Sequence, residues 1–410
     1  MTERCTCCIV GGGPAGMMLG LLLARAGVDA LVLEKHADFL RDFRGDTIHP
    51  STLEVMHELG LLEEFLKLPH QEAREISAQV GDERVPVADF THLPTRCKFV
   101  ALMPQWDFLD FLAAKAARYP SFRLRMRAEA VGLVEEAGRV AGVEVMAAEG
   151  PIQIRADLVV GADGRRSVIR ERAGLEVREF GAPMDVLWFR LSRRSDDPAN
   201  LMGIFGSGRI FVLLNRDSYW QCGYVIAKGT IDAIRRQGIE AFRESVARIV
   251  PYVRDRVAEL RSWDDVSLLT VRVDRLARWY RSGLLCIGDA AHAMSPVGGI
   301  GINLALQDAV ATANLLAAPL REGRVTAEDL SRVQKRRELP TRVTQWFQVQ
   351  VQKRVIAPVL GGAASSRLPL PLQLLRRFAV LRRLPARLIG IGFRPEHVKS
   401  AAAPGALTGR

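Results

Sequence analysis

A glycine-rich stretch near the start of the chain constrains the fold more than any other feature. Gly11, Gly13 and Gly16 stand in Gly-Gly-Gly-Pro-Ala-Gly, between an apolar segment and a segment with helical periodicity. In this context the first glycine permits a tight turn, the second lets the backbone approach a pyrophosphate, and the third lets helix and strand pack closely. Pro14 and Ala15 lead into a helix whose N-terminus offers free N–H groups and partial positive charge to phosphates.

The elements expected around this stretch alternate between strand and helix. They are a strand over Thr6–Val10, a helix over Ala15–Ala26 and a strand over Ala30–Glu34. This order implies parallel strands joined by a right-handed crossover. Glu34 ends the second strand, where a carboxylate accepts hydrogen bonds from ribose hydroxyls and would repel a 2′-phosphate. The strand, the helix and Glu34 together favour a dinucleotide-binding site over an ordinary glycine-rich turn.

A second glycine motif follows an apolar strand in the middle of the chain. The stretch Gly161-Ala-Asp163-Gly164-Arg-Arg-Ser167 comes after a strand expected over Ile152–Val160 and before a short helical segment. Taken alone, it predicts a turn in which Asp163 or Ser167 caps the helix.

A third motif, from Cys286 to Asn303, has the order strand, Gly-Asp, glycine-rich loop and helix. Asp289 follows a buried strand and is placed to hold a polyol hydroxyl. The glycines of the loop let the backbone approach a flat ring closely. The helix beginning near Gly301 directs its positive end toward whatever lies above it, which would stabilise negative charge on a bound ring.

The three motifs, in this order and at these spacings, resemble those of the class A flavoprotein monooxygenases, the para-hydroxybenzoate hydroxylase family, over about residues 8–320. The resemblance implies bound FAD, NADH or NADPH as co-substrate, and O₂ as the oxygen source. It implies hydroxylation of an aromatic or similarly electron-rich small molecule through a flavin hydroperoxide, with a flavin that moves between two positions. The positions that it assigns to cofactor binding are Gly11, Gly13, Pro14, Ala15, Gly16, Glu34, Arg44, Gln105, Val131, Asp163, Asp289, Gly301, Ile302 and Asn303.

Several of these residues have roles that the resemblance alone implies. Arg44 would close over the flavin and the pyrophosphate, Gln105 would lie near the ribityl chain, and the backbone of Val131 would meet the adenine. Pro296 and Gly298 belong to the loop that would face the isoalloxazine and are the residues placed nearest the chemistry. No acid–base residue is assigned, and His292, although close to the third motif, is given no role.

The fold class predicted is α/β, with a Rossmann-like FAD-binding domain, an inserted, mostly antiparallel β-sheet substrate domain and a helical C-terminus. A strand pair is expected over Glu75–Phe90, and a three-stranded meander over Phe122–Met126, Ala130–Glu135 and Val140–Ala147. We assign residues 1–74, 98–180 and 272–330 to the FAD-binding domain, 75–97 and 181–271 to the substrate domain, and 331–410 to a basic helical segment. Prolines are expected to break the helices of that segment, at Pro340, Pro358, Pro369, Pro371 and Pro385.

The inserted sheet should supply the substrate contacts, although alternation along strands means that only some of its side chains face the substrate. Its aromatic content favours an apolar, aromatic substrate. The candidates are Trp188, Arg190, Phe205, Phe211, Leu213, Trp220 and Tyr224.

The cysteines do not predict a metal site. Cys5, Cys7 and Cys8 lie on the first expected strand, where neighbouring side chains point to opposite faces, and no histidine or second cysteine pair completes a tetrahedral set. We interpret them as apolar filling of a buried strand. Six scattered cysteines and the lack of a recognisable secretory signal favour a reducing cytoplasm.

The net charge of +11 is concentrated at the C-terminus. Residues 331–410 hold 16 lysines and arginines and two acidic residues, a balance of +14, whereas the rest of the chain has 41 basic and 44 acidic residues, a balance of −3. Within it, the stretch Leu368–Val398 is rich in leucine, isoleucine and phenylalanine, interleaved with arginines. This stretch could lie on an anionic membrane, but we favour packing of its apolar side on the FAD-binding domain. Nucleic acid is not expected, because no aromatic stacking pattern accompanies the arginines.

Two alternatives to the monooxygenase stay open at this point. One is a membrane-associated FAD-dependent reductase or a quinone- or isoprenoid-linked hydroxylase of the same fold. The other is a flavin-binding scaffold without turnover. The sequence does not name the substrate, choose between NADH and NADPH, or distinguish a monomer from a homodimer.

Overall fold

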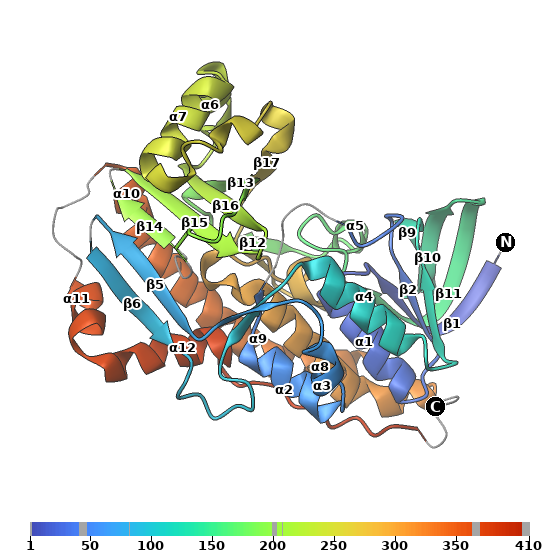
Figure 1. Cartoon of the computed structure of the whole chain (residues 1–410). Coiled ribbons are helices and arrows are strands. Elements are labelled where there is room, and N and C mark those ends of the chain that lie inside the picture. The colour runs from blue at the N-terminus through green and yellow to red at the C-terminus, as the bar shows by residue number, and fades with distance from the viewer. Residues whose placement is uncertain are drawn as a thin grey trace.

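A computed structural model describes residues 2–40, 47–81, 83–198, 203–206, 208–362 and 370–403. These residues form two lobes, each built on one large sheet, with helices packed between and around them (Figure 1). The fold is the α/β class expected from the sequence.

The first sheet forms the FAD-binding lobe. Its order is β19-β20-β11-β1-β2-β8, and β10 and β9 extend it from β11. The central strand β1 runs parallel to both neighbours, with Cys7 opposite Leu158 of β11 and Ala30 of β2. The strands are β1 (Thr2–Val10), β2 (Ala30–Leu33), β8 (Phe122–Arg125), β9 (Glu129–Glu136), β10 (Arg139–Ala147), β11 (Gly150–Gly161), β19 (Tyr280–Arg281) and β20 (Leu284–Cys286).

Burial of β1 on both faces accounts for its cysteines. Cys5, Cys7 and Cys8 are each at most 2% exposed and belong to the main apolar core. Burial raises the pKa of the Cys7 thiol well above its ordinary value, so this thiol stays neutral.

The predicted meander was wrong in one strand. β8 does not pair with β9 but runs parallel to β2, with Leu33 opposite Arg125. The antiparallel meander consists of β9, β10 and β11. The chain leaves the first pairing at Arg127, which has a positive φ of 53° and donates its backbone N–H to the carbonyl of His36.

The second sheet is mostly antiparallel, in the order β17-β13-β16-β15-β14-β5-β6, with one parallel pair between β5 and β14. The strand pair expected over Glu75–Phe90 is present as β5 and β6. Helices α6 (Ile231–Arg236) and α7 (Ile239–Ile249) lie on its outer side (Figure 1). Its strands are β5 (Glu75–Val80), β6 (Glu83–Asp89), β13 (Met184–Ser192), β14 (Gly203–Gly206), β15 (Arg209–Asn215), β16 (Tyr219–Ala227) and β17 (Ser267–Leu269).

Two small sheets and several helices complete the connections. The small sheets pair β3 (Thr47–Ile48) and β4 (Gln71–Ala73) with β7 (Val100–Leu102), and β12 (Val177–Glu179) with β18 (Asp274–Leu276). The remaining helices are α1 (Pro14–Arg25), α2 (Pro50–Glu58), α3 (Leu62–Phe65), α4 (Gln105–Ala116), α5 (Val168–Arg172), α8 (Ile300–Arg321), α9 (Ala327–Val351), α10 (Ala357–Leu360), α11 (Leu370–Arg377) and α12 (Arg383–Gly390).

Helix α8 is apolar because it is a core helix. By length and composition, the segment Val297–Arg321 could cross a membrane, with a mean hydropathy of 1.2, but 78% of its most apolar stretch is buried inside the protein. It packs beside α1 in the main core (Figure 1).

Helix α9 corrects the expectation that Pro340 breaks the chain, because it continues through this proline to Val351. A proline inside a helix removes one backbone hydrogen bond, and Pro340 is buried within the otherwise continuous helix. A capping box between Thr326 and Asp329 also fixes the start of the helix.

A described segment near the C-terminus forms a strap across the FAD-binding lobe. We use this name for residues 391–403. The Val398 amide donates to the Glu58 carboxylate of α2 at 2.7 Å, and the Ser400 amide donates to Asn314 of α8 at 2.9 Å. The Arg25 guanidinium of α1 donates to the Ser400 carbonyl at 2.6 Å. The last described residues thus lie beside the helix that follows the first strand.

Candidate active site

The first glycine motif has the close packing that its sequence predicts. A methyl group at Gly16 would lie 1.9 Å from the Gly11 carbonyl oxygen, so only glycine lets α1 approach the turn this closely. Gly11 has a φ of +109° and lies against the backbone of Ala162 in the second motif. A methyl group at Gly13 would meet no atom within 4 Å, so this backbone is open to a ligand.

Glu34 lies at the base of this turn and is 2% exposed. One carboxylate oxygen accepts from the Gly12 amide at 2.9 Å and the other from the His36 amide at 3.0 Å. These bonds fix the carboxylate beside the turn. The Glu34 carbonyl accepts from the Ala128 amide at 2.9 Å, which brings the start of β9 beside the turn.

The second motif acts as a helix cap. Asp163 accepts from the Ser167 hydroxyl at 2.5 Å and from the Ile169 amide at 3.2 Å, while the Ser167 hydroxyl accepts from the Arg170 amide at 3.0 Å. Both residues weighed as caps from the sequence therefore take part. Burial raises the pKa of Asp163, although hydrogen bonds to its carboxylate oppose this shift.

The third motif joins the other two at Gly288. This glycine has a φ of +59°, and a methyl group there would lie 3.3 Å from Ala15 of α1 and 3.2 Å from Ala305 of α8. One residue earlier, the Ile287 amide donates to the Gly161 carbonyl at 2.9 Å. All three motifs therefore meet at one end of the first sheet.

Asp289 lies next to this junction and pairs with a residue of the second motif. Its carboxylate accepts from the Arg165 guanidinium at 3.1 Å, and its side chain is 27% exposed. The other terminal nitrogen of Arg165, Nη1, is buried, and no described residue accepts a hydrogen bond from it. A buried donor without an acceptor costs about 1–3 kcal/mol, so a ligand oxygen would stabilise it.

The loop expected to face the flavin, Pro296–Gly299, is called the PVGG loop below. Gly298 and Gly299 have φ values of +77° and +64°, which favour glycine at both positions. Helix α8 begins directly after it, and Gly301 and Ile302 lie partly exposed in the first turn. Asn303 is 1% exposed, and its side-chain oxygen accepts from the hydroxyls of Ser51 and Thr52 of α2, at 2.5 and 3.1 Å.

His49 holds the PVGG loop to the C-terminal part of the chain, and sequence reasoning did not find it. Its ring Nδ1 lies 2.8 Å from the Ile389 carbonyl of α12, and its Nε2 lies 3.1 Å from the Gly299 carbonyl. The imidazole is 1% exposed, and burial lowers its pKa to about 4. A neutral His49 donates a hydrogen bond from only one of its two ring nitrogens. The Thr47 hydroxyl also lies within reach of the ring, 3.2 Å from Nε2.

A buried charge network supports the third motif from behind. Asp308 of α8 accepts from the Gly288 amide at 3.1 Å, from Arg337 Nε at 2.9 Å and lies 2.5 Å from His292 Nε2. Arg337 of α9 also reaches Glu396 of the strap at 3.3 Å. This arrangement gives His292 a buried partner in Asp308.

The other predicted cofactor residues are spread around this junction. Arg44 lies outside the described residues. Gln105 is the first residue of α4, directly after Pro104. Val131 lies on β9, three residues after Ala128, and its side chain is 39% exposed.

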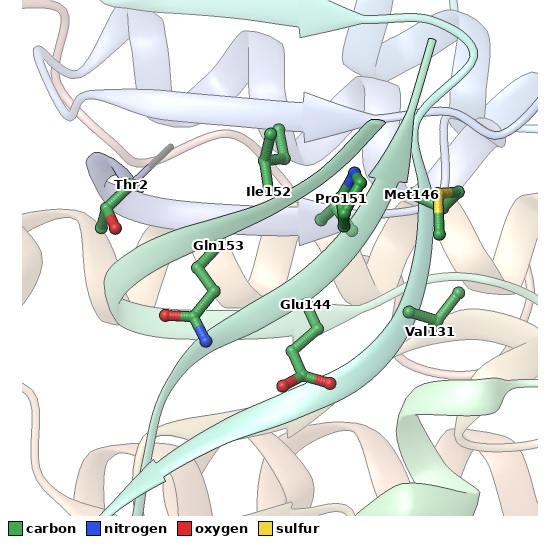
Figure 2. A pocket seen from close by; sticks show the side chains of 8 residues that line it. Thr2, Val131, Glu144, Met146, Pro151, Ile152 and Gln153 are labelled. Carbon is green, nitrogen blue, oxygen red and sulfur yellow. The ribbon is translucent and has the colours of Figure 1, made fainter. Parts of the chain in front are cut away.

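A surface hollow of about 390 Å³ lies on the curved meander of β9, β10 and β11 and is separate from the three motifs (Figure 2). Val131 is the one predicted cofactor residue that lines it. Its lining residues are Thr2, Val131, Glu144, Val145, Met146, Pro151, Ile152 and Gln153.

The substrate candidates divide between the two faces of the second sheet. Phe211, Leu213, Trp220 and Tyr224 pack with α7 in the outer core and point away from the PVGG loop. On the opposite face, Trp188 and Phe205 pack against the same buried cluster as Val297 of the PVGG loop. Arg190 lies on that face, with its guanidinium 5.8 Å from the Trp106 ring of α4 and 4.9 Å from the Tyr219 ring.

Comparisons with known proteins agree with this architecture. The family model described as "FAD binding domain" matches residues 4–347. The chain is 33% identical to 6-methylpretetramide 4-monooxygenase of Streptomyces rimosus, over 91% of each protein. The chain belongs to the class A flavoprotein monooxygenases.

Two further proteins are similar to most of this monooxygenase. The 12-dehydrotetracycline 5-monooxygenase/anhydrotetracycline 6-monooxygenase of S. rimosus is 29% identical, and the chain spans only 60% of its length. The crystal structure of p-nitrophenol 4-monooxygenase from Pseudomonas putida superposes with a TM-score of 0.74 at 21% identity, covering 95% of this chain and 99% of that one, which supports the fold.

Family membership makes the protein an FAD-dependent oxidoreductase, and the residues at the motif junction fit FAD. Gly13 leaves its backbone open, the Glu34 carboxylate is fixed beside the turn, and Arg165 has a buried donor beside Asp289 that no described residue accepts from. A dinucleotide requires these three groups: a backbone turn that is open to its phosphates, a carboxylate that accepts from its hydroxyls, and a guanidinium that donates to its oxygen atoms.

Replacing Asp289 with alanine tests this site. We expect Asp289→Ala to weaken FAD binding by about tenfold or more, because Arg165 and a cofactor hydroxyl would each lose a partner worth about 1–3 kcal/mol. The measurement is fluorescence of FAD released on dilution of the holoenzyme. Glu322→Ala, on an exposed residue at the end of α8, serves as the control and should bind FAD normally. Equal retention in both variants would mean that Asp289 is only a turn residue.

Proposed function

We propose that this monooxygenase hydroxylates a planar, polycyclic phenolic compound, with NADH or NADPH as electron donor and O₂ as oxygen source. The observation that carries this proposal is the match to 6-methylpretetramide 4-monooxygenase over nine-tenths of both proteins. The aromatic side chains on the sheet face toward the PVGG loop also favour a flat aromatic substrate.

The residues at the motif junction would bind the cofactor. Glu34 would accept from ribose hydroxyls, and the first amides of α1 would bind the pyrophosphate. Arg165 and Asp289 would hold the polar chain that leads to the ring system, and the start of α8 would stabilise negative charge on that ring. When bound, FAD supplies the transfer of electrons from NAD(P)H and of one oxygen atom from O₂.

The chain's own task during the reaction is to place the substrate and exclude water. The two buried histidines near the PVGG loop are both held by neighbouring groups, since His49 lies between the Ile389 and Gly299 carbonyls and His292 lies against Asp308. We therefore assign no general base. The apolar cluster that includes Val297, Trp188 and Phe205 would keep water from the reacting ring.

Substrate-dependent turnover tests the proposal. The purified, yellow protein should release FAD, not FMN, and should oxidise NADH or NADPH faster when a polycyclic phenol is added, giving a product heavier by one oxygen atom. A saturated product would favour the reductase alternative. Stimulation by no aromatic compound, with FAD bound, would favour the scaffold and contradict the proposal.

Contact with an anionic membrane surface is a second candidate role, favoured by one observation. Several large apolar side chains around α11 and α12 point to solvent and are interleaved with arginines. The inner side of α12 is packed, since Ala386, Ile389 and Ile391 lie in one buried cluster with both Phe90 of the substrate domain and Ile300 of α8. The segment therefore packs on both lobes and not on the FAD-binding domain alone, which was the packing favoured from the sequence. Flotation with anionic liposomes at physiological salt tests the outer side. The exposed residues are Leu370, Leu374, Phe378, Val380, Leu384 and Phe393.

A further inference from the structure

Two aromatic rings cover two glycines on the sheet face toward the PVGG loop. Gly203 of β14, Val212 of β15, Gly223 of β16 and Trp188 of β13 lie opposite one another across four strands. A methyl group at Gly223 would lie 2.9 Å from the Trp188 ring, and one at Gly203 would lie 3.1 Å from the Phe205 ring. Glycine at these positions therefore lets each ring lie over the backbone of the sheet.

This arrangement makes an aromatic floor, a name we use for Trp188 and Phe205 together. Both rings pack against a buried cluster to which Val297 of the PVGG loop and Ile356, after α9, also contribute. The floor thus adjoins the loop expected to face the flavin. Flat aromatic ligands bind such rings by stacked or edge contacts.

The Trp188 side chain has a donor that the protein does not use. Its indole Nε1 is buried, and no described residue accepts a hydrogen bond from it. The same is true of Trp279, but that residue is completely buried in the core of the FAD-binding lobe. Trp188 is only partly buried and lies on the face turned toward the site, where a bound molecule can supply the acceptor.

We infer that Trp188 determines substrate specificity, by donating its indole N–H to a phenolic or carbonyl oxygen of a planar aromatic substrate that lies on the aromatic floor. This inference rests on the proposed function and refines it, since it requires an oxygen at the edge of the ring system. Phe205 would contact the substrate's rings without distinguishing their substituents. The affinity for the substrate should therefore depend on its oxygen atom through Trp188 alone, and on its ring system through both Trp188 and Phe205.

Binding of two probes to the oxidised holoenzyme tests this division. The probes are 1,8-dihydroxyanthraquinone and anthracene, which share three fused rings but differ in oxygen, and the measurement is equilibrium dialysis without NAD(P)H. In Trp188→Phe the dihydroxyanthraquinone should bind about tenfold more weakly, as expected for one lost hydrogen bond, while anthracene binding stays unchanged. In the matched control Phe205→Leu both probes should weaken to a similar extent.

The outcomes separate this inference from the proposed function. A general loosening of the sheet would weaken both probes in Trp188→Phe, and this result would overturn the inference. If Trp188→Phe folds poorly, Gly223→Ala gives a second test. The methyl group added at Gly223 would displace the Trp188 indole and should reduce the preference for the oxygenated probe. If the unchanged protein binds neither probe, the aromatic substrate class itself is wrong and Trp188 has no such role.

Discussion

Replacing Asp308 with alanine should lower the free energy of unfolding by about 3–5 kcal/mol, the cost of breaking a buried ion pair from one side. Asp308 and Arg337 are both 0% exposed, so neither charge can turn to water when its partner is removed. Burial alone would raise the pKa of Asp308, but His292 and Arg337 lower it below its ordinary value, so the carboxylate is charged. The variant would leave Arg337, His292 and the Gly288 amide without this acceptor.

Urea unfolding of the FAD-free protein measures this loss without a contribution from the cofactor. Glu322→Ala is the matched control, because Glu322 lies at the end of the same helix but pairs with Arg324 on the surface. An exposed pair contributes at most about 1 kcal/mol. A loss in Asp308→Ala no larger than that in the control would mean that the network adds nothing to the stability of the fold.

Acidification should destabilise the protein through His49 more than through an ordinary surface histidine. The folded pKa of His49 is about 4, below the ordinary value of 6.5, because burial disfavours the charged ring. The unfolded state therefore binds the proton first as pH falls. The contribution of His49 to stability is complete above pH 6.5 and is lost between pH 6.5 and pH 4, by about 3 kcal/mol in total.

The difference between the unchanged protein and His49→Gln isolates this effect. Urea unfolding at several pH values from 7.5 to 4.5 should show a steeper fall for the unchanged protein, because glutamine does not titrate. His70→Gln, on a partly exposed histidine, controls for general effects of the substitution. Parallel curves for all three proteins would show that His49 is not neutral and buried as described.

The sequence predicted those parts of the site that rest on backbone geometry. Gly11, Gly16 and Gly288 allow contacts that no other residue permits, so their spacing reports the turn directly. The same holds for Asp163 and Ser167, whose short side chains cap a helix that begins nearby. The family resemblance then added the cofactor and the reaction, which residue patterns alone did not name.

Contacts between side chains that are distant in the sequence could not be predicted from sequence patterns. Arg337 lies in a helix far along the chain from Asp308, and His49 joins two carbonyls that belong to separate segments. No local spacing marks such pairs. The pairing of β8 with β2 was missed for a related reason, since an apolar run does not reveal which neighbour completes its hydrogen bonds.

The strap contributes to the folding of the FAD-binding lobe. Glu396 is a partner of Arg337, Val398 donates to Glu58 of α2, and Ser400 accepts from Arg25 of the first helix. During synthesis these residues leave the ribosome after every glycine motif has already emerged. The FAD-binding lobe can therefore reach its final form only after the strap has been synthesised, and a truncated chain that lacks the strap would be expected to stay colourless.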